Sequence, residues 1–468
     1  MPPPAELIDR DGERRRLLEV TTDAPALVVV RGRRRIGKSF LLSRSLDGAR
    51  VIFFQADQQD QAGQLNLLAR EAARLLPGRP PLAFPDWERA LAFLGELAVT
   101  APLTLVLDEF QYLCAAQPAL PSILQRHWDR WQRQSVPVAV VLCGSALTFM
   151  QGLLDHGGPL FGRADYRPIV EPLDYRWTGS FAAEREPAAL LRRYAVLGGT
   201  PQYQVWAGPG TLSEVIRERI LTKGSPLYEE PLNLLRQEEG VRDPGTYFSV
   251  LRAIAEGATR TGEIGSRAGL KGPNATRVLD RLSRLGYIER REPLAPRLRE
   301  SRAVHRIRDP FFRFWFRYVF GNRSRLERER VDEVLQEIEA DLDTYMGWAF
   351  EDCCREWVNR FAPEAEVGDS ESVGSWWSRD GRREIDVVGM KGRRYVVLGS
   401  CKWRRRVDRD VLDQLYEHRA GLGGPAVQAR LALFAREGFT DRVSERARQE
   451  GVLLVSAADL FSAGQREP

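Results

Sequence analysis

The chain has 468 residues, 43% of them hydrophobic and 28% charged, and its formal net charge is +5. Because a single hydrophobic core stops growing at about 250–300 residues, this length predicts several domains. The composition is ordinary for packed proteins and excludes wholesale disorder. The small positive charge is compatible with binding to nucleic acid and equally with a solvated surface, so it does not discriminate between them.

The sequence contains no signal that directs it into a membrane. No apolar run reaches the roughly 18 residues that a membrane-spanning helix needs. The first residues, MPPPAE, lack the layout of a signal peptide. The five cysteines are odd in number and form no CxxC pair, which is typical of reduced thiols. The sequence therefore predicts a cytoplasmic protein without a membrane partner.

Short apolar runs alternate with helical patterns through roughly the first 200 residues. These runs are rich in β-branched residues and lie at 26–30, 50–54, 103–107 and 136–142. Strands that are buried on both faces and separated by helices are typical of a parallel α/β sheet. The pattern changes near residue 240 and again near residue 335, which predicts three domains.

The first apolar run is followed by a glycine-containing loop and a helical pattern. Residues 32–39 read GRRRIGKS and fit GxxxxGK[ST] in the strand-loop-helix context of a phosphate-binding loop, or P-loop. Glycines let the backbone turn so that its N–H groups and the helix N-terminus face phosphate. We expect Lys38 to reach the β- and γ-phosphates of ATP and the Ser39 hydroxyl to bind Mg²⁺. The predicted ATP-binding residues of this loop are Gly32, Arg33, Arg34, Arg35, Ile36, Gly37, Lys38 and Ser39.

The third apolar run, 103–107, ends in two carboxylates, Asp108 and Glu109. A P-loop enzyme needs a carboxylate for its metal ion and a group that orients the attacking water. The sequence therefore predicts Asp108 as the Mg²⁺ partner and Glu109 as the base or water-positioning group. An acidic pair also occurs where a buried strand simply meets solvent, but the upstream P-loop favours the catalytic interpretation.

Two further residues are predicted to take part in catalysis. Ser145 follows the fourth apolar run, where the carboxyl edge of the sheet faces ligand, and it is predicted to sense the γ-phosphate. The alternative is a serine that caps the next helix. Arg163 follows a glycine-rich turn and is predicted to stabilise transition-state charge, within its own subunit or across a homo-oligomer. A surface salt bridge is the competing role for Arg163.

Six short segments occur in a fixed order along most of the chain. They are IDRDGE at 8–13, RRIGKS at 34–39, LDEFQYL at 107–113, CGS at 143–145, GGTPQY at 198–203 and RDPF at 308–311. Together they resemble the prokaryotic, archaeal-type ATPases of the AAA+ superfamily, which often carry a nuclease-like C-terminal domain. The resemblance implies a helical lid after the sheet and places Arg10 near the adenine of ATP. It also implies that the P-loop strand lies between the sensor strand and another strand.

Residues 247–292 predict three short helices followed by a strand, which is the outline of a winged helix-turn-helix. On the third helix the apolar side chains form one stripe, and Arg277 and Arg281 lie on other faces. With Lys271 before the helix, these arginines suit contacts to DNA phosphates. A solvated basic face and a protein-binding role remain alternatives.

Residues 309–318 read DPFFRFWFRY. The segment begins like a helix, with Asp309 as the N-cap and Pro310 in the first turn. Its aromatic side chains crowd nearly all faces of that helix. This pattern predicts a buried helix that bridges two domains, in preference to an aromatic binding platform.

The last part of the chain predicts a helix, two strands and a second helix that carry polar residues. Their order resembles the restriction-endonuclease-like PD-(D/E)XK fold. In that fold an Asp, together with a Glu two residues before a Lys, holds a metal ion that activates water. The corresponding residues, which form a predicted vestigial nuclease site, are Glu351, Asp386, Ser400, Lys402 and Gln414.

Position 400 departs from this pattern. Asp386 and Lys402 fit, but serine cannot supply the anionic oxygen that a hard divalent cation prefers. Either Glu351 substitutes from the neighbouring helix, or the domain has kept its fold and lost its reaction. The sequence therefore predicts little or no cleavage of nucleic acid.

These observations predict an α/β protein that uses ATP and Mg²⁺ as a conformational switch coupled to DNA or to a protein. Two alternatives remain: an ATP-regulated, metal-dependent DNA nuclease, and a signalling or defence scaffold whose C-terminal domain is not catalytic. The predicted domains are a P-loop domain with a helical lid at 1–240, a winged helix and bridging helix at 241–335, and a nuclease-like domain at 336–468.

Overall fold

The structure, a computed structural model, describes residues 6–46, 50–77, 81–238, 241, 243–295 and 303–462. The chain divides into two compact units. The first, called here the P-loop unit, holds the residues up to Leu173 together with Thr200–Gln202. The second holds Asp174–Gly199 and the residues from Tyr203 onward. The three domains expected from boundaries near 240 and 335 stay a prediction.

The P-loop unit is built on a parallel sheet in the order β1-β4-β3-β2. Beyond β1, Tyr166 and Ile169 form parallel bridges with Val28 and Arg31. The P-loop strand β1 is therefore the edge strand of this sheet and pairs with the sensor strand β4; on its other side, where the resemblance implied another strand, the described residues form these two isolated bridges. The strands of this sheet are β1 (Ala26–Arg31), β2 (Val51–Gln55), β3 (Leu103–Asp108) and β4 (Val138–Gly144).

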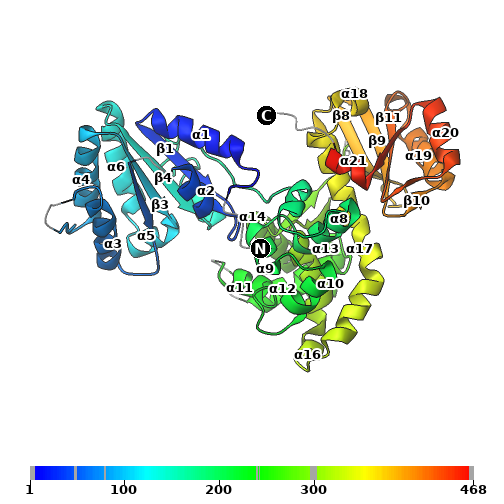
Figure 1. Cartoon of the computed structure of the whole chain (residues 1–468), viewed down its shortest axis with the longest axis horizontal. Helices are drawn as coiled ribbons and strands as arrows, with labels where there is room; N and C mark the ends of the chain where they lie inside the picture. The colour runs from blue at the N-terminus through cyan, green and yellow to red at the C-terminus, as the bar shows by residue number, and fades with distance from the viewer. Residues whose placement is uncertain are drawn as a thin grey trace. The chain divides into compact units, whose positions relative to one another are not determined.

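Helices cover both faces of this sheet, as Figure 1 shows. Alternation along β3 sends Leu105 and Leu107 into one core and Val106 into the other. The first core is covered by α3 (Gln61–Ala73), α4 (Trp87–Thr100), α5 (Phe110–Ala116) and α6 (Leu120–Arg133). The second is covered by α1 (Asp11–Thr22) and α2 (Lys38–Ser45), while the short α7 (Leu147–Gly152) follows β4.

Local sequence fixes where these helices begin. The side chain of Asp60 accepts a hydrogen bond from the backbone N–H of Gly63 at 2.9 Å, so α3 starts after it. The side chain of Asp86 caps α4 in the same way, because it accepts a hydrogen bond from the backbone N–H of Arg89 at 2.7 Å. Such caps satisfy backbone donors that have no partner inside the helix.

In the second unit, one continuous hydrophobic core joins elements that are far apart in sequence. It contains Ala195 from the first helices, Ile254 from the winged helix and Trp357 from the long helix α17. The first helices of this unit are η1 (Tyr175–Ser180), α8 (Pro187–Leu197), α9 (Pro201–Ala207) from Tyr203 onward, α10 (Leu212–Val215), η2 (Ile216–Leu221) and α11 (Glu230–Arg236). They occupy the position in sequence of the predicted lid, and their placement over a nucleotide stays a prediction.

The predicted winged helix is confirmed. Three helices precede an antiparallel pair of strands, and Ala275, Val278 and Leu282 form the buried stripe of the third helix. The elements are α12 (Pro244–Ala255), α13 (Thr261–Arg267), α14 (Gly272–Arg284), β5 (Ile288–Arg291) and β6 (Val304–Ile307).

The aromatic segment after the winged helix is buried, as its sequence predicts. Asp309 accepts hydrogen bonds from the backbone N–H groups of Phe311 and Phe312, at 2.9 and 3.3 Å, and so caps the helix. The indole N–H of Trp315 donates to the carbonyl of Tyr228 at 2.9 Å. The segment comprises α15 (Pro310–Phe314), η3 (Trp315–Val319), η4 (Phe320–Asn322) and α16 (Arg323–Leu326).

The C-terminal part of the second unit is a five-stranded sheet in the order β13-β11-β9-β8-β7. Strands β7, β8 and β9 pair antiparallel, and β9, β11 and β13 pair parallel. The strands are β7 (Ser372–Trp377), β8 (Glu384–Lys391), β9 (Arg394–Lys402), β11 (Arg430–Ala435) and β13 (Leu453–Ser456). A separate short pair is formed by β10 (Arg406–Val407) and β12 (Gly438–Phe439).

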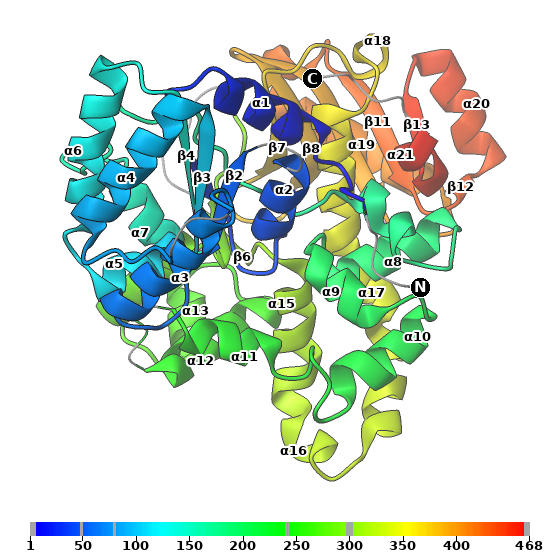
Figure 2. The same cartoon turned by 60° about the vertical axis from the view of Figure 1, so that its left-hand side comes forward.

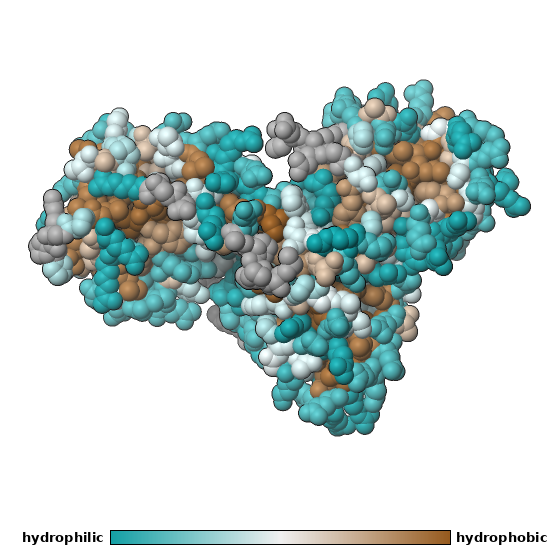
Figure 3. Space-filling view, in the orientation of Figure 1, coloured by the Kyte–Doolittle hydropathy of each residue, from teal (hydrophilic) through white to brown (hydrophobic). Residues whose placement is uncertain are grey.

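Helices cover both faces of this second sheet too. Helix α17 (Val331–Arg360) extends from α16 to the sheet, as Figure 2 shows, and packs against one face with α21 (Ala457–Ser462). Helices α19 (Arg409–Leu422) and α20 (Asp441–Glu450) cover the other face. Hydrophilic residues cover α20 on the face drawn in Figure 3, while its Val443 and Ala447 point inward. The short α18 (Glu364–Val367) and η5 (Gly424–Ala426) complete this part.

Within the described residues, none of the helices combines the length and the apolar character that crossing a bilayer requires.

Candidate functional site

Both glycines of the P-loop have a structural reason. Gly37 is the N-cap of α2 and has φ of 89°, a left-handed conformation that favours glycine. A Cβ at Gly32 would lie 2.7 Å from the carbonyl oxygen of Val170, so a side chain there would push the neighbouring backbone away. The loop therefore keeps the tight path that the sequence pattern predicts, with Lys38 and Ser39 in the first turn of α2.

Lys38 is buried, and its ammonium group donates to the carbonyl of Arg33 at 3.0 Å. Burial lowers the pKa of Lys38, and the neighbouring carboxylates of Glu109 and Asp108 oppose that shift. The P-loop lysine and the acidic pair, which are 70 residues apart in sequence, therefore interact in one site.

Asp108 is fully buried at the end of β3. Its Oδ1 accepts a hydrogen bond from the backbone N–H of Glu109 at 3.0 Å. Its Oδ2 accepts none from an N–H or O–H group in the described residues, and the neighbouring Cys143 thiol is only a weak donor. A buried carboxylate oxygen without such a partner costs free energy. It therefore fits a cation such as Mg²⁺, or a water bound to one.

Glu109 stands at the N-cap of α5 with φ of 53°, which is uncommon for a residue other than glycine. Its Oε2 accepts hydrogen bonds from the Ser145 hydroxyl at 3.0 Å and from Nε2 of Gln111. Ser145 and Glu109, which were both predicted as catalytic residues, are therefore hydrogen-bonded to each other. Gln111 was missed as a site residue, although it lies in the 107–113 segment two residues after Glu109.

The structure pairs Arg163 with a carboxylate of its own unit. Its Nε and Nη2 donate to the two carboxylate oxygens of Asp129 at 2.7 and 3.0 Å. This bidentate pair lowers the pKa of Asp129. A role for Arg163 in transition-state stabilisation stays a prediction and requires that this pair open.

Arg10 and Arg34 also make contacts inside the P-loop unit. Arg10 is buried, and it donates to Glu13 at 3.0 Å and to the carbonyl of Glu171 at 2.6 Å. Arg34 donates to the hydroxyl of Tyr112 at 3.1 Å, which ties the P-loop to α5. Contact of Arg10 with adenine stays a prediction.

The three basic residues predicted to contact DNA differ in exposure. Lys271, the N-cap of α14, and Arg277 are exposed, while Arg281 is half-buried. Among the described residues, the winged-helix ion pairs of Arg267 with Glu263 and of Arg290 with Glu292 do not involve Lys271 or Arg277. These two side chains are therefore the better placed to contact an anionic partner.

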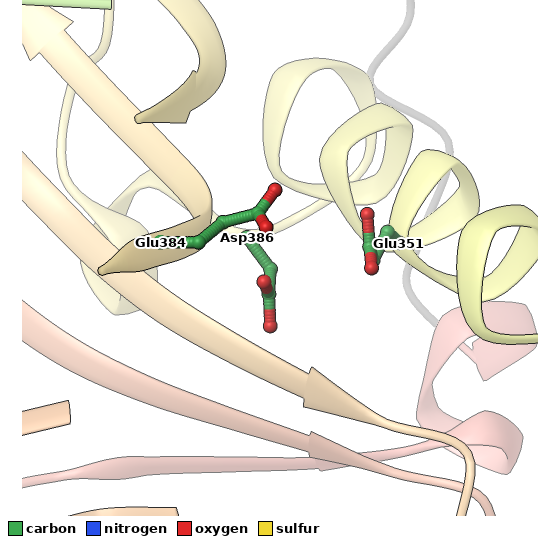
Figure 4. Close-up of side chains that lie close together, drawn as sticks. All are labelled: Glu351, Glu384 and Asp386. Carbon is green, nitrogen blue, oxygen red and sulfur yellow. The ribbon is translucent and has the colours of Figure 1, made fainter. Parts of the chain in front are cut away.

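A cluster of three carboxylates lies between α17 and β8, as Figure 4 shows. Glu351 comes from the helix, and Glu384 and Asp386 come from the strand; one oxygen of each lies within 4.8 Å of the others. Glu384 was missed in the sequence. The available signal was its two-residue spacing from Asp386, which puts both side chains on one face of a strand.

Strand β9 contacts one oxygen of this cluster through consecutive residues. Oδ2 of Asp386 accepts hydrogen bonds from the Ser400 hydroxyl at 3.1 Å and from the backbone N–H of Cys401 at 2.7 Å. The Lys402 ammonium lies 3.7 Å from the same oxygen. Ser400 and Lys402 therefore face Asp386 together, which is the placement that strand alternation predicts.

Arginines oppose the negative charge of the cluster. Burial, followed by the charge of Asp386, raises the pKa of Glu351 to about 7. Oε2 of Glu351 lies 3.6 Å from Arg355 and 3.8 Å from Arg306, which belongs to the wing strand β6. Burial also raises the pKa of Glu384.

The predicted Gln414 lies on α19 and is exposed. Its place in the vestigial nuclease site stays a prediction. Helix α19 contacts the backbone of strand β8 through His418, whose Nδ1 lies 2.7 Å from the carbonyl oxygen of Glu384.

Two family models match separate parts of the chain. Residues 244–296 match the MarR family, and residues 315–413 match a family of archaeal and bacterial proteins of unknown function. An uncharacterized protein of Methanocaldococcus jannaschii is 28% identical over 414 residues, which covers 86% of this chain and 89% of that protein. The MarR match agrees with the winged helix seen in the structure.

Solved structures are similar to the chain at low identity. The Walker-type ATPase of Pyrococcus abyssi is 20% identical with a TM-score of 0.49, covering 68% of this chain and 98% of that one. The ORC2 protein of Aeropyrum pernix is 16% identical with a TM-score of 0.43, covering 72% and 96%. The P-loop unit is a parallel α/β sheet with a P-loop after its strand β1. This description rests on the unit's own features, which are the β1-β4-β3-β2 order, the segment that bridges to β1 on its other side, and the P-loop.

Proposed function

We propose that the chain binds ATP with Mg²⁺ at the P-loop, hydrolyses it, and uses the cycle as a conformational switch. The observation that carries this proposal is the convergence of Lys38, Asp108 and Glu109 in one site at the carboxyl edge of the sheet. The site combines the Lys38 ammonium for the phosphates, a buried carboxylate oxygen that has no N–H or O–H donor among the described residues, and a second carboxylate.

Each residue has a distinct task in this proposal. Lys38 and the first turn of α2 bind the β- and γ-phosphates. The Ser39 hydroxyl and Oδ2 of Asp108 would hold Mg²⁺, whose charge neutralises the phosphate oxygens when it is bound. Glu109 orients the attacking water. The water oxygen then bonds to the γ-phosphorus, the bond to the ADP oxygen breaks, and the water proton leaves through Glu109.

The partner that this switch acts on is proposed to be DNA. The exposed Lys271 and Arg277 at α14 support this, because a winged helix uses such side chains to contact phosphates. The match of residues 244–296 to the MarR family supports the winged-helix fold on which this proposal depends. A protein partner is the competing proposal. The cytoplasmic location of the chain and its oligomeric state stay predictions.

Mg²⁺-dependent phosphate release by the full chain tests the ATPase proposal. Lys38→Ala removes the phosphate contact, and we expect it to lower ATP turnover by at least about 100-fold and to abolish tight ATP binding. Lys223→Ala, at an exposed lysine, is the matched control and should retain native turnover. Equal turnover by the Lys38→Ala and native chains would contradict the proposal.

A second function, metal-dependent cleavage of DNA, is favoured by one observation. Glu384 supplies a third carboxylate beside Glu351 and Asp386, which compensates in part for the serine at position 400. Glu351, Glu384 and Asp386 would hold the cation, and Oε2 of Glu351 has no hydrogen-bond donor in the described residues. Nicking of supercoiled plasmid by the native chain, lost on Asp386→Ala, would promote this function above a non-catalytic role.

A further inference from the structure

The carboxylate of Glu109 is held by side chains from two different elements. Gln111, in the first turn of α5, donates through Nε2 to Oε2 of Glu109, and Ser145 after β4 donates to the same oxygen at 3.0 Å. Nε2 of Gln111 also lies 3.2 Å from the Ser145 hydroxyl, so the three groups close a ring. Gln111 and Ser145 are each only 8% exposed, so water competes little for these bonds.

Gln111 and Ser145 both donate to Oε2 of Glu109 and not to its Oε1. Among the described residues, none donates a hydrogen bond to Oε1 of Glu109, and this side chain is half-buried rather than enclosed. A carboxylate can accept several hydrogen bonds at each oxygen. Oε1 is therefore the oxygen that remains for a water molecule, and the ring fixes the direction in which it points.

The contact of Gln111 depends on a glycine in the neighbouring strand. A Cβ at Gly144 would lie 2.8 Å from Oε1 of Gln111 and 2.6 Å from Sδ of Met150. Met150 is fully buried, so it has little room to move. Gly144 thus lets Gln111 reach Glu109 and Ser145, and this close approach explains the glycine of the 143–145 segment.

We propose that Gln111 is a positioning residue for ATP hydrolysis, which holds Glu109 so that its Oε1 faces the attacking water. The inference rests on the proposed ATPase function. Gln111 acts through Glu109 and not by contact with ATP. A serine hydroxyl rotates freely about its C–O bond, whereas the Gln111 amide contacts both Glu109 and Ser145 and so fixes the ring. Small errors in the geometry of a reacting group cost large factors in rate.

The first test compares, in the full chain, Gln111 in the first turn of α5 with Gln117, the C-cap of the same helix. Gln111→Ala should lower kcat for ATP by about tenfold or more and leave KM within about twofold, because the amide serves the water and not the nucleotide. Gln117→Ala is the matched control, since Gln117 caps the end of α5 and donates to Gln61 at 2.8 Å. Native kcat in the Gln111→Ala chain would overturn the inference.

A double-mutant cycle separates positioning from a structural role. In a Glu109→Gln background, Gln111→Ala should cause no further loss of single-turnover rate, because the group that Gln111 orients is already gone. An equal loss in both backgrounds would overturn the inference. Gln111→Glu keeps the size of the side chain but cannot donate to a carboxylate when ionised, and it should lose kcat at least as strongly. It provides the same comparison if the alanine variant fails to fold.

The outcomes also distinguish this inference from the proposed function. If the native chain releases no phosphate from ATP, the ATPase proposal itself fails and the inference fails with it. If the native chain hydrolyses ATP and Gln111→Ala does so equally well, only the inference fails.

Discussion

The P-loop unit and the C-terminal sheet each bring a lysine together with acidic side chains, but the carboxylate oxygens are used differently. At the P-loop, Oδ2 of Asp108 is buried without an N–H or O–H donor among the described residues. At the carboxylate cluster, the corresponding oxygen of Asp386 already contacts Ser400, Cys401 and Lys402. The cluster has three carboxylates and the P-loop site has two, so the number of carboxylates alone does not predict which site binds a cation better.

The difference shows that a cation site depends on which lone pairs the protein leaves unused. The Asp108 oxygen gains its missing partner when a cation or a bound water arrives. Among the described residues Oε2 of Glu351 also lacks a hydrogen-bond donor, but Arg355 and Arg306 lie 3.6 and 3.8 Å from it, so a cation there would have to compete with two guanidinium charges. We therefore expect the P-loop site to bind metal with nucleotide and the carboxylate cluster to bind metal weakly.

The pH dependence of stability tests whether Glu351 in the carboxylate cluster is protonated in the folded chain. In the folded chain burial raises the pKa of Glu351 to about 7. In the unfolded chain the pKa of a glutamate is about 4.3. The folded state therefore binds more protons between these values, and stability falls as pH rises through this window. Relative to Glu351→Gln, the native chain should lose on the order of 2 kcal/mol of unfolding free energy between about pH 5 and about pH 8.

Denaturant unfolding of the two chains at a series of pH values measures this difference. Glu366→Gln is the control, because Glu366 is exposed on α18. A constant difference between native and Glu351→Gln chains across the series would contradict the raised pKa.

Placing a carboxylate at position 400 should sharpen the comparison further. Ser400→Glu adds an anionic oxygen beside Asp386 and on the side of β9 that carries Lys402. We expect the affinity of the full chain for Mn²⁺ to rise about tenfold, measured by calorimetry without nucleotide in a Lys38→Ala background. Ser372→Glu, on the exposed edge of β7, is the control. Unchanged affinity would show that position 400 does not face the cation.

Charge reversal on the winged helix should give the smallest effect. Arg277→Glu removes one exposed cation from α14, and we expect it to weaken DNA binding about fivefold at low salt. The slope of log affinity against log salt concentration should fall by about 1, the value for one lost phosphate contact. Arg89→Glu, an equal charge change on α4 in the P-loop unit, should have no such effect. Equal DNA retention by both variants would favour a protein partner for the winged helix.

Contiguous motifs were the part of this molecule that the sequence predicted best. The P-loop and the Asp108–Glu109 pair each depend on a short segment after a buried strand, and strand alternation correctly put Ser400 and Lys402 on one side. The buried aromatic helix and the winged helix were also predicted, because apolar spacing along a helix determines its buried face.

Contacts between distant residues could not be predicted in the same way. The pairing of Arg163 with Asp129 joins positions 34 residues apart, and the contact of Arg306 with Glu351 joins the wing to α17. Glu384 and Gln111 each lie two residues from a predicted site residue, but their roles depend on which face of a neighbouring element they meet. Tertiary packing decides that, and a single sequence does not contain it explicitly.

The most direct test of the central claim is ATP binding and hydrolysis by the Glu109→Gln chain. Because the substitution keeps the size of the side chain and removes its charge, we expect ATP affinity within about threefold of native and kcat lowered by at least about 100-fold. Glu96→Gln, at an exposed position of α4, should match the native chain in both measurements. Hydrolysis by Glu109→Gln at the native rate would contradict the assignment of the acidic pair and the mechanism built on it.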